Sequence, residues 1–267
     1  MNMNASIERI AALEWANYAA MLSTAQATPG LELHLREDVI LTSSRIFPTP
    51  DANHACLLRT TPEKVETLIA EVKEYFRSQD LPATIFISPA CAPSDLAERL
   101  GRLGFIEQEM RETWMTLDHL LDREIPALLP QVTVRPIDQE QVSTFADTFV
   151  AAFEMPADFS PYLAQLLEHS IGLPNVHHYL ALIDGQTVGT CSLLRSEKIG
   201  VLGSAGVMPE HRRGGAATNL AIKAAQDARK QGVDTLMVQT TVGAWLERLL
   251  RINGFEKAFT RTCHTLP

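Results

Sequence analysis

Residues 207–220 are the part of the sequence whose residue types and order best fit a chemical task. An apolar run stops at Pro209, a turn with two arginines and two glycines follows, and small residues begin at Ala216. The first N–H groups of a helix have no partner within the helix, and the helix dipole makes that end positive. The pattern therefore predicts an anion site, approached over the glycines.

We expect the first main-chain N–H groups of this helix to bind a phosphate group, because Gly214 and Gly215 have no side chain to keep it away. Ala216 and Ala217 are small enough for a bulky ligand to lie against the first turn, and Arg212 and Arg213 can add charge-assisted hydrogen bonds. A glycine-containing surface turn with two exposed arginines is the alternative interpretation.

The elements around this turn occur twice along the chain. The first half predicts strands at 31–36, 39–42, 54–58, 83–88, 106–109 and 113–117, and helices from Thr61, with Thr61 as the N-cap, and over 95–103. The second half predicts strands at 133–136, 177–183, 187–194, 199–207 and 235–240 with two short strands at the end, and helices over 139–153, 161–170, 215–231 and 244–252.

One pattern recurs at matching places in both halves. Residues 96–105 and 246–255 each place leucines four apart on a helix face and then end in Gly-Phe. The recurrence predicts an internal duplication, with one domain over residues 1–125, a second over 131–267, and a linker around 118–131.

The second half resembles the GNAT superfamily of N-acetyltransferases. Arg212, Gly215 and Ala217 match its acetyl-CoA signature, which is Arg or Gln, two residues, Gly, one residue, then Gly or Ala. The signature follows an apolar strand and precedes a helix, a strand, a helix and Gly254-Phe255, in the family's order. The resemblance implies an α/β (α+β) fold with a mixed sheet, built as two GNAT-like acyl-CoA N-acyltransferase domains in tandem.

The resemblance also implies how acetyl-CoA binds. The fourth and fifth strands of the second domain would splay apart, and the pantetheine arm would add to the fourth strand as a peptide adds to a sheet edge. Backbone groups near Ala205, Val207 and Met208 would hold this arm, and the main-chain N–H groups of Arg213 to Thr218 would hold the pyrophosphate. Two glycines and a serine in 203–206 interrupt the strand, which indicates a bulge or a close approach of another backbone; an irregular strand is the alternative.

The first half departs from the signature where its corresponding helix begins. Residues 59–63 contain no glycine, Pro62 lacks an N–H group for phosphate, and Glu63 would repel phosphate. We therefore expect the N-terminal domain to be a degenerate copy that has lost the cofactor.

The catalytic residues are unknown from the sequence. Many members of the family protonate the departing thiolate with a tyrosine that here corresponds to Leu250, and no tyrosine follows Tyr179. Glu154 is a candidate base and Ser204 a candidate acceptor contact. A solvated glutamate at a helix end and a small strand residue are the respective alternatives.

Other reactive side chains favour structural interpretations. His177 and His178 point to opposite faces of their strand, so they predict no metal site. Cys191 fits a buried thiol, and His211 fits a neighbour of the phosphate or a surface residue. Trp245 has helix packing as its default role, with contact to pantetheine as the alternative.

Composition excludes several classes of partner. The formal net charge of −9 opposes nucleic acid binding, and no apolar run is long enough to span a membrane. Four separated cysteines and an N-terminus without a signal-peptide pattern indicate a cytoplasmic protein. We expect acetyl-CoA as co-substrate and a small-molecule or peptide amine as acceptor. A homodimer stays open.

Two rival functions remain from the sequence. A non-catalytic acyl-CoA-binding or sensing protein fits the leucine at position 250. An aminoacyl or peptidyl transferase would also pair two such domains, but it has no need of the acetyl-CoA signature.

Overall fold

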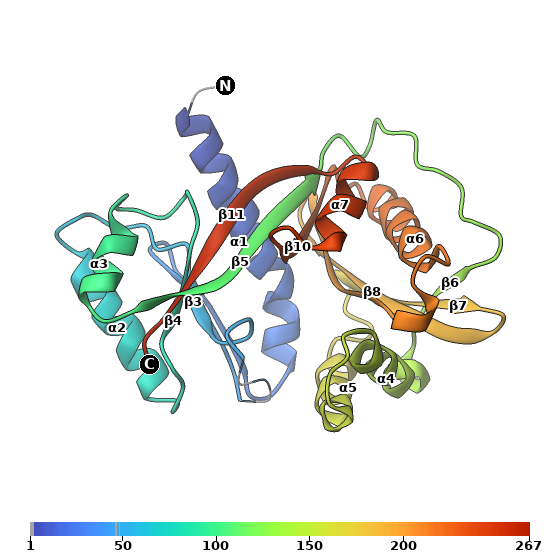
Figure 1. Ribbon diagram of the computed structural model, residues 1–267, viewed down its shortest axis with the longest axis horizontal. Coiled ribbons are helices and arrows are strands. Elements are labelled where there is room, and N and C mark those ends of the chain that lie inside the picture. Colours follow the sequence, from blue (N-terminus) through green and yellow to red (C-terminus); the bar gives the residue numbers. More distant parts are fainter. Residues whose placement is uncertain (1–2, 46, 48) are drawn as a thin grey trace. The chain divides into compact units, whose positions relative to one another are not determined.

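A computed structural model describes residues 3–45, 47 and 49–267 (Figure 1). Residues 1 and 2, part of the N-terminus predicted not to be a secretory signal, lie outside the described residues. The chain forms two compact units: unit 1 comprises Met1–Thr116 and Gln239–Pro267, and unit 2 comprises Leu117–Val238. The units differ from the predicted division at 125–131, because the last segment of the chain packs with the first.

Unit 1 is a mixed sheet with helices. Its helices are α1 (Met3–Ala27), α2 (Val65–Arg77), α3 (Leu96–Arg102) and α7 (Trp245–Ile252), and its strands are β1 (Leu31–Leu35), β2 (Ile40–Ser44), β3 (His54–Cys56), β4 (Thr84–Ile87), β5 (Ile106–Leu117) and β11 (Glu256–Thr265). The strand order is β1-β2-β3-β4-β11-β5. Only β3 and β4 run parallel within this order.

Helix α2 confirms the helical spacing of apolar residues in the first half. Its buried face consists of Val65, Leu68, Ile69, Val72 and Phe76. These side chains pack in one core with Leu96 and Leu100 of α3. The predicted start at Thr61 is wrong, because residues 62–64 form a turn and α2 begins at Val65 with Lys64 as its N-cap.

Helix α1 was not predicted, and the reason is visible in its burial. Glu14 is completely buried, whereas the neighbouring Trp15 is 39% exposed. A charged residue therefore lies on the buried face of this helix and a large apolar residue is exposed, so the sequence lacks the amphipathic pattern of a packed helix.

The last strand of the chain lies between β4 and β5 in unit 1. Two short strands were expected at the end of each half, and each pair is a single strand instead, β5 in the first half and β11 at the C-terminus. Glu112 looked like part of a break in β5, but it pairs with Arg261 of β11. Each half thus supplies one long strand, and the two strands pair with each other.

Arg261 is the centre of a buried ionic cluster. Its Nε and Nη2 atoms donate to Glu112 at 2.7 and 2.6 Å, and its Nη1 atom donates to Tyr18 at 2.9 Å and lies 3.4 Å from Glu14. The guanidinium lies between two rings, 4.6 Å from the Phe86 centroid and 4.5 Å from the Trp114 centroid. These contacts connect β11 to α1, β4 and β5.

The cluster holds two carboxyl groups for one guanidinium. Burial raises the pKa of the Glu14 carboxyl, although Arg261 and Ser88 lower it. Tyr18 donates to His54 Nε2, and His54 Nδ1 donates to the Pro50 carbonyl at 2.9 Å. Both nitrogen atoms of the His54 ring therefore have a hydrogen-bond partner. Burial also lowers the pKa of His54 to about 3, which keeps this ring neutral.

Unit 2 carries the second set of elements. Its strands are β6 (Thr133–Pro136), β7 (Val176–Ile183), β8 (Gln186–Ser196), β9 (Ile199–Val207) and the first part of β10 (Thr235–Thr241), and its helices are α4 (Val142–Ala152), α5 (Ser160–Glu168) and α6 (Ala216–Lys230), with short 3₁₀ turns at Gln139–Gln141, Ala157–Phe159 and Pro209–His211. The strands follow the order β10-β9-β8-β7-β6. Helices α4 and α6 both contact β8, from opposite faces (Figure 1).

Strand β9 has two irregularities at the end that leads to the predicted anion turn. Its parallel pairing with β10 ends at the Leu202–Val238 pair. Beyond that pair its register with β8 shifts between Gly203 and Gly206, and Ser204 has a positive φ of 49°. The predicted bulge is therefore confirmed.

His178 is a buried bridge within unit 2. Its Nε2 and Nδ1 atoms lie 2.8 Å from Ser170 Oγ and 2.7 Å from Ser192 Oγ. Ser170 also donates to the Leu167 carbonyl, so its hydroxyl proton is already used. Burial, with a smaller contribution from His177, lowers the pKa of His178 to about 4.

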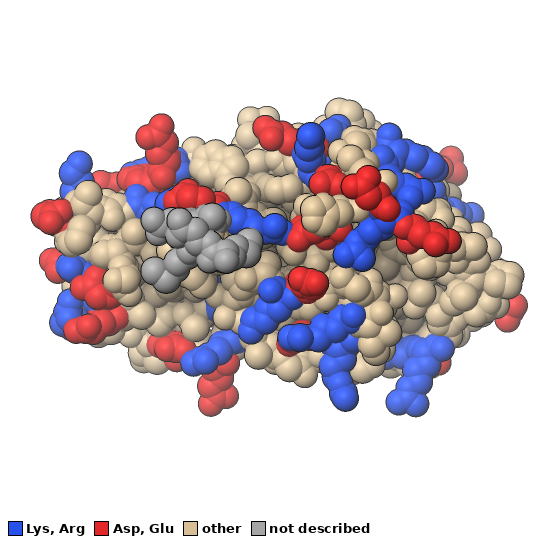
Figure 2. Space-filling model, turned by 90° about the horizontal axis from the view of Figure 1, so that it is seen from above, with Lys and Arg blue, Asp and Glu red and all other residues tan. Residues whose placement is uncertain are grey.

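The surface mixes both signs of charge. On the face drawn in Figure 2, basic and acidic side chains are interspersed. Within the part of the chain that the structure describes, no helix is both long and apolar enough to cross a bilayer, and no group of three or more potential metal-ligating side chains comes together.

Replacing Arg261 with Ala should destabilise the protein strongly. The change leaves Glu112 and Glu14 buried without their cation, which typically costs about 3–5 kcal/mol. Urea unfolding measures the loss, with Arg251→Ala as control, since Arg251 makes an ion pair on the exposed side of α7 worth about 1 kcal/mol or less. Equal losses in the two variants would contradict the role of the cluster.

His178 should make unit 2 sensitive to acid. An unfolded histidine titrates near pH 6.5, so between pH 6.5 and about 4 the unfolded chain binds a proton that folded His178 does not. The contribution of His178 to the free energy of unfolding is therefore fully present above pH 6.5 and is lost as the pH is lowered toward 4. The free energy of unfolding at pH 7 and pH 4.5 tests this: His178→Asn should lose less on acidification than the wild type, and an unchanged loss would exclude the assignment.

Candidate active site

The predicted anion turn connects β9 to α6. After Val207 the chain makes a 3₁₀ turn, then Arg213 and Gly215 take positive φ angles of 75° and 87°, and α6 begins at Ala216. The first helical hydrogen bond runs from Asn219 N–H to the Gly215 carbonyl at 3.0 Å. Gly215 is the N-cap, and no side chain caps the helix.

Four consecutive N–H groups are left free by this geometry. In the described structure the amides of residues 215–218 donate to no protein acceptor. Ala217 and Thr218 are half-buried, and Ala216 is buried. A helix start without a cap, with small side chains around it, is suited to an anion.

The two glycines have roles that the sequence did not indicate. The Gly214 N–H group donates to the His211 carbonyl at 3.2 Å, so it is engaged within the turn rather than free for a ligand. A Cβ atom on Gly215 would lie 2.7 Å from Leu129 Cδ1. The left-handed backbone thus favours glycine at position 215, and a larger residue there would displace the end of the Leu129 side chain.

Arg212 does not point away from the protein as expected for a phosphate contact. Its Nε atom donates to the Val207 carbonyl at 3.2 Å, and its Nη2 atom donates to the Ala152 carbonyl and to Glu154 Oε1, both at 3.1 Å. The side chain therefore joins the end of β9 to the end of α4.

Of the two arginines, Arg213 is the one whose side chain is not engaged by the protein. It is exposed, and its guanidinium makes no ion pair or hydrogen bond with any residue that the structure describes. Its positive φ directs the chain into Gly215 and α6. The cation available beside the free amides is therefore Arg213 rather than Arg212.

Glu154 ends α4 in a Schellman motif. Glu154 N–H donates to the Ala151 carbonyl, Met155 N–H donates to the Val150 carbonyl, and Glu154 has the left-handed φ of 54°. This arrangement leaves the Ala152 carbonyl for Arg212. One oxygen of the Glu154 carboxylate accepts from the same guanidinium, and the side chain is 67% exposed.

The second half of β9 offers a backbone edge. Residues 203–207 pair with β8, whereas the parallel register on the other side ends at Leu202. Ser204 lies in the bulge, and its carbonyl accepts from Thr190 Oγ1 at 2.7 Å. Ala205 and Val207 are half-buried at this edge, but the Met208 N–H group, an expected contact, donates to the Val188 carbonyl at 2.9 Å.

The end of α4 covers part of this strand. A Cβ atom on Gly206 would lie 2.7 Å from Phe153 Cε2 and 3.0 Å from Ala152 Cβ. A Cβ atom on Gly203 would meet nothing within 4 Å. The strand is therefore covered at Gly206 and open at Gly203, which leaves space beside the bulge.

The remaining reactive side chains have structural partners. His177 Nε2 lies 2.8 Å from Gln231 Nε2, while His178 bridges two serines, so the two histidines do not share a site. Cys191 is buried, and burial raises the pKa of its thiol to about 12. Leu250, at the position of the family's tyrosine, is buried in α7 of unit 1, and Trp245 is 59% exposed.

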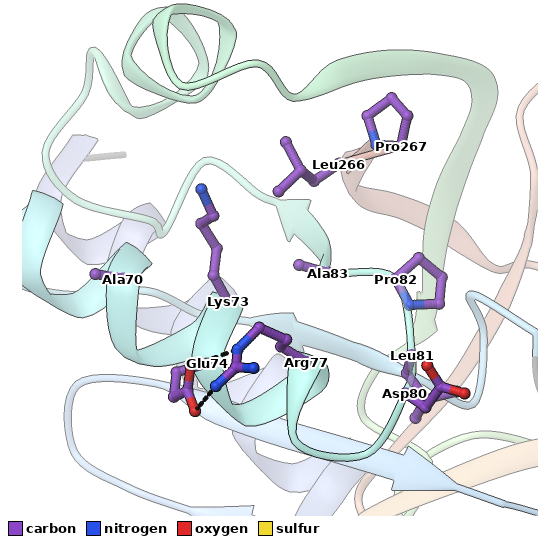
Figure 3. A pocket seen from close by; sticks show the side chains of 10 residues that line it. All are labelled: Ala70, Lys73, Glu74, Arg77, Asp80, Leu81, Pro82, Ala83, Leu266 and Pro267. Carbon is purple, nitrogen blue, oxygen red and sulfur yellow. Dashed lines mark hydrogen bonds and ion pairs between the residues drawn. The ribbon is translucent and has the colours of Figure 1, made fainter.

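A hollow of about 550 Å³ lies in unit 1 between the end of α2 and the C-terminus (Figure 3). Its lining residues are Ala70, Lys73, Glu74, Arg77, Asp80, Leu81, Pro82, Ala83, Leu266 and Pro267. Two of them, Glu74 and Arg77, form an ion pair at 2.6 Å. The lining includes none of the predicted site residues and no hydroxyl, thiol or imidazole group.

Three solved structures show the fold of the whole chain. A GCN5-related N-acetyltransferase from Kribbella flavida has 18% identity and a TM-score of 0.65, covering 93% of this chain and 95% of its own. A tandem GNAT protein from the clavulanic acid biosynthesis pathway has 16% identity and a TM-score of 0.64, covering 99% and 95%. The C-terminal domain of a putative lysylphosphatidylglycerol synthetase from Agrobacterium fabrum has 12% identity and a TM-score of 0.51, covering 100% and 93%.

The sequence comparisons agree with this fold. No curated protein matches the sequence at a significant level. Residues 143–255 match the model of the acetyltransferase (GNAT) family, a span that contains the anion turn and all of α6. The family that this model describes is a family of acyltransferases. Residues 143–255 thus resemble the acetyltransferase (GNAT) family in sequence, and the chain has the fold of a tandem GNAT protein.

Proposed function

We propose that the protein transfers the acetyl group of acetyl-CoA to a primary amine. The observation that carries the proposal is the set of free N–H groups at residues 215–218, one turn after the open edge at the end of β9. A diphosphate on these amides and an extended pantetheine arm along residues 203–207 would satisfy both groups of unpaired backbone atoms.

The chemistry requires little from the protein beyond placement. The neutral amine attacks the thioester carbonyl carbon, the C–N bond forms, the C–S bond breaks, and the departing sulfur takes up the proton that the amine loses. A free thiol has a pKa of about 8.5, so the thiolate can leave without the acid that Leu250 replaces. Positioning of the two reactants supplies much of the rate.

The candidate catalytic residues differ in suitability. One oxygen of Glu154 is engaged by Arg212, so the base must act through its other oxygen or be another group. Ser204 lies on the bulge of β9, beside the space at Gly203. We keep Ser204 as the acceptor contact and Glu154 as the candidate base.

The N-terminal half is proposed to be a copy without cofactor. Where the second half has its anion turn, residues 61–64 form a turn ahead of α2, and α2 begins without a glycine. Arg59, which lies two residues before this turn, is engaged by Glu8. We therefore assign residues 1–125 a supporting role and residues 131–267 the reaction.

Two rivals have specific support. A non-catalytic acyl-CoA sensor agrees with Leu250, and the likeness to a lysylphosphatidylglycerol synthetase domain keeps an aminoacyl transferase open. The free amides favour CoA over the second rival. A cytoplasmic location agrees with the four free cysteines, and the homodimer stays a prediction.

Charge reversal at Arg213 should weaken acetyl-CoA binding. Arg213→Glu places an anion beside the diphosphate and removes no protein contact, so we expect the Kd to rise about tenfold or more in calorimetry. Lys198→Glu is the matched control, because Lys198 is exposed in the turn at the other end of β9. Equal affinity in the wild type and Arg213→Glu would contradict the assignment.

Release of CoA thiol should depend on an added amine. A panel of polyamines, amino acids, aminoglycosides and peptide N-termini, assayed with a thiol reagent, separates an enzyme from a sensor. Amine-dependent thiol release supports transfer. Tight acetyl-CoA binding without release for any amine would favour the sensor, and no binding at all would overturn the proposal.

A further inference from the structure

The segment that joins the two halves is fixed along α6. Three side chains of α6 bind its backbone: Asn219 binds Leu129 and Val132, Gln226 donates to the Pro126 carbonyl at 3.4 Å, and Arg229 donates to the Arg123 carbonyl at 2.9 Å. Figure 1 shows the segment, in green, running past α6 toward β6.

The spacing of these contacts shows an extended, antiparallel run. From residue 219 to 226 the helix rises about 10.5 Å, and from residue 129 back to 126 an extended chain covers about 10 Å. The linker therefore stays in register with the helix over these residues. It ends at the first turn of α6, beside the free amides.

Asn219 makes the strongest of these attachments. Its side chain is completely buried, and its Nδ2 atom donates to the Leu129 and Val132 carbonyls at 2.9 and 2.8 Å. Its Oδ1 atom accepts from Leu129 N–H at 2.9 Å. The amide binds both backbone groups of Leu129, as a paired strand would, and no polar atom of it is left unsatisfied.

Two side chains of the linker lie beside the predicted anion turn. Leu129 Cδ1 lies 2.7 Å and Gln131 Nε2 lies 3.6 Å from the position of a Cβ atom on Gly215. Gln131 is exposed, and its side-chain amide has no hydrogen-bond partner among the described residues. An unused donor therefore lies beside the unused amides.

We propose that Gln131 donates a hydrogen bond to the diphosphate of acyl-CoA and that Asn219 is the positioning residue that holds it there. The proposal rests on the proposed function. It makes the linker a wall of the cofactor site, so the connection between the two halves contributes to cofactor affinity.

The test compares two exposed glutamines in unit 2. Gln131→Glu removes the donor and adds a negative charge beside a diphosphate, so the Kd for CoA should rise about tenfold or more. Gln165→Glu makes the same change on α5, on the face of the sheet opposite α6, and should leave the Kd unchanged. Binding of pantetheine, which has no diphosphate, should be the same in both variants.

Asn219→Ala tests the positioning role. The affinity of Asn219→Ala for CoA should be lower than that of the wild type, as in Gln131→Glu. Arg229→Ala, which loosens the linker farther along α6, should keep the wild-type Kd. Combining Asn219→Ala with Gln131→Ala should cost no more CoA affinity than Asn219→Ala alone, because Gln131 has already lost its place.

The outcomes separate the two proposals. If the wild type binds no CoA, the proposed function fails and this inference falls with it. If the wild type binds CoA and Gln131→Glu binds it equally well, or if pantetheine binding falls as much as CoA binding, the inference alone is overturned.

Discussion

Unpaired backbone groups are the constraint on which the second unit depends. Buried N–H and C=O groups are costly without a partner, and folded proteins leave few of them. Here the helix start at residues 215–218 and the edge of residues 203–207 are both incomplete, and only the turn of residues 208–214 separates them in the chain. An extended ligand with a diphosphate at its end would complete both, which is the basis of the proposed function.

Unit 1 meets a related constraint by a different route. Its sheet would end at β4 and β5 as separate edges, but β11 lies between them and pairs with both. Arg261 fastens that strand through carboxyl groups and aromatic rings from three other elements. An ion cluster with an excess carboxyl group is a costly way to stabilise a core. Its position favours a role in specifying which strand occupies that place.

Local signals explain what could be predicted. The glycine-containing turn between β9 and α6, the helices α2 and α6, and the bulge of β9 each follow from neighbouring residues: a glycine with positive φ, apolar spacing, or small residues in a strand. Helix α1 was missed because Glu14 lies inside and Trp15 outside, and the partners of buried Glu14, Arg261 and Ser88, are distant in sequence. The joined strands β5 and β11 were missed for the same reason, since their pairing connects the two halves of the chain.

The signature residues show where local reasoning ends. Each residue of the signature was expected to contact acetyl-CoA, because the motif is the acetyl-CoA signature of the family. A residue of the motif can contact other parts of the protein instead. Arg212 binds α4, Gly214 closes its own turn, and Gly215 makes room for Leu129 of the linker. These three residues build the loop, and the N–H groups of residues 215–218 and the Arg213 guanidinium have no protein partner among the described residues. Such a division of labour is physically reasonable, because free amides bind an anion well only when the backbone that presents them is already fixed.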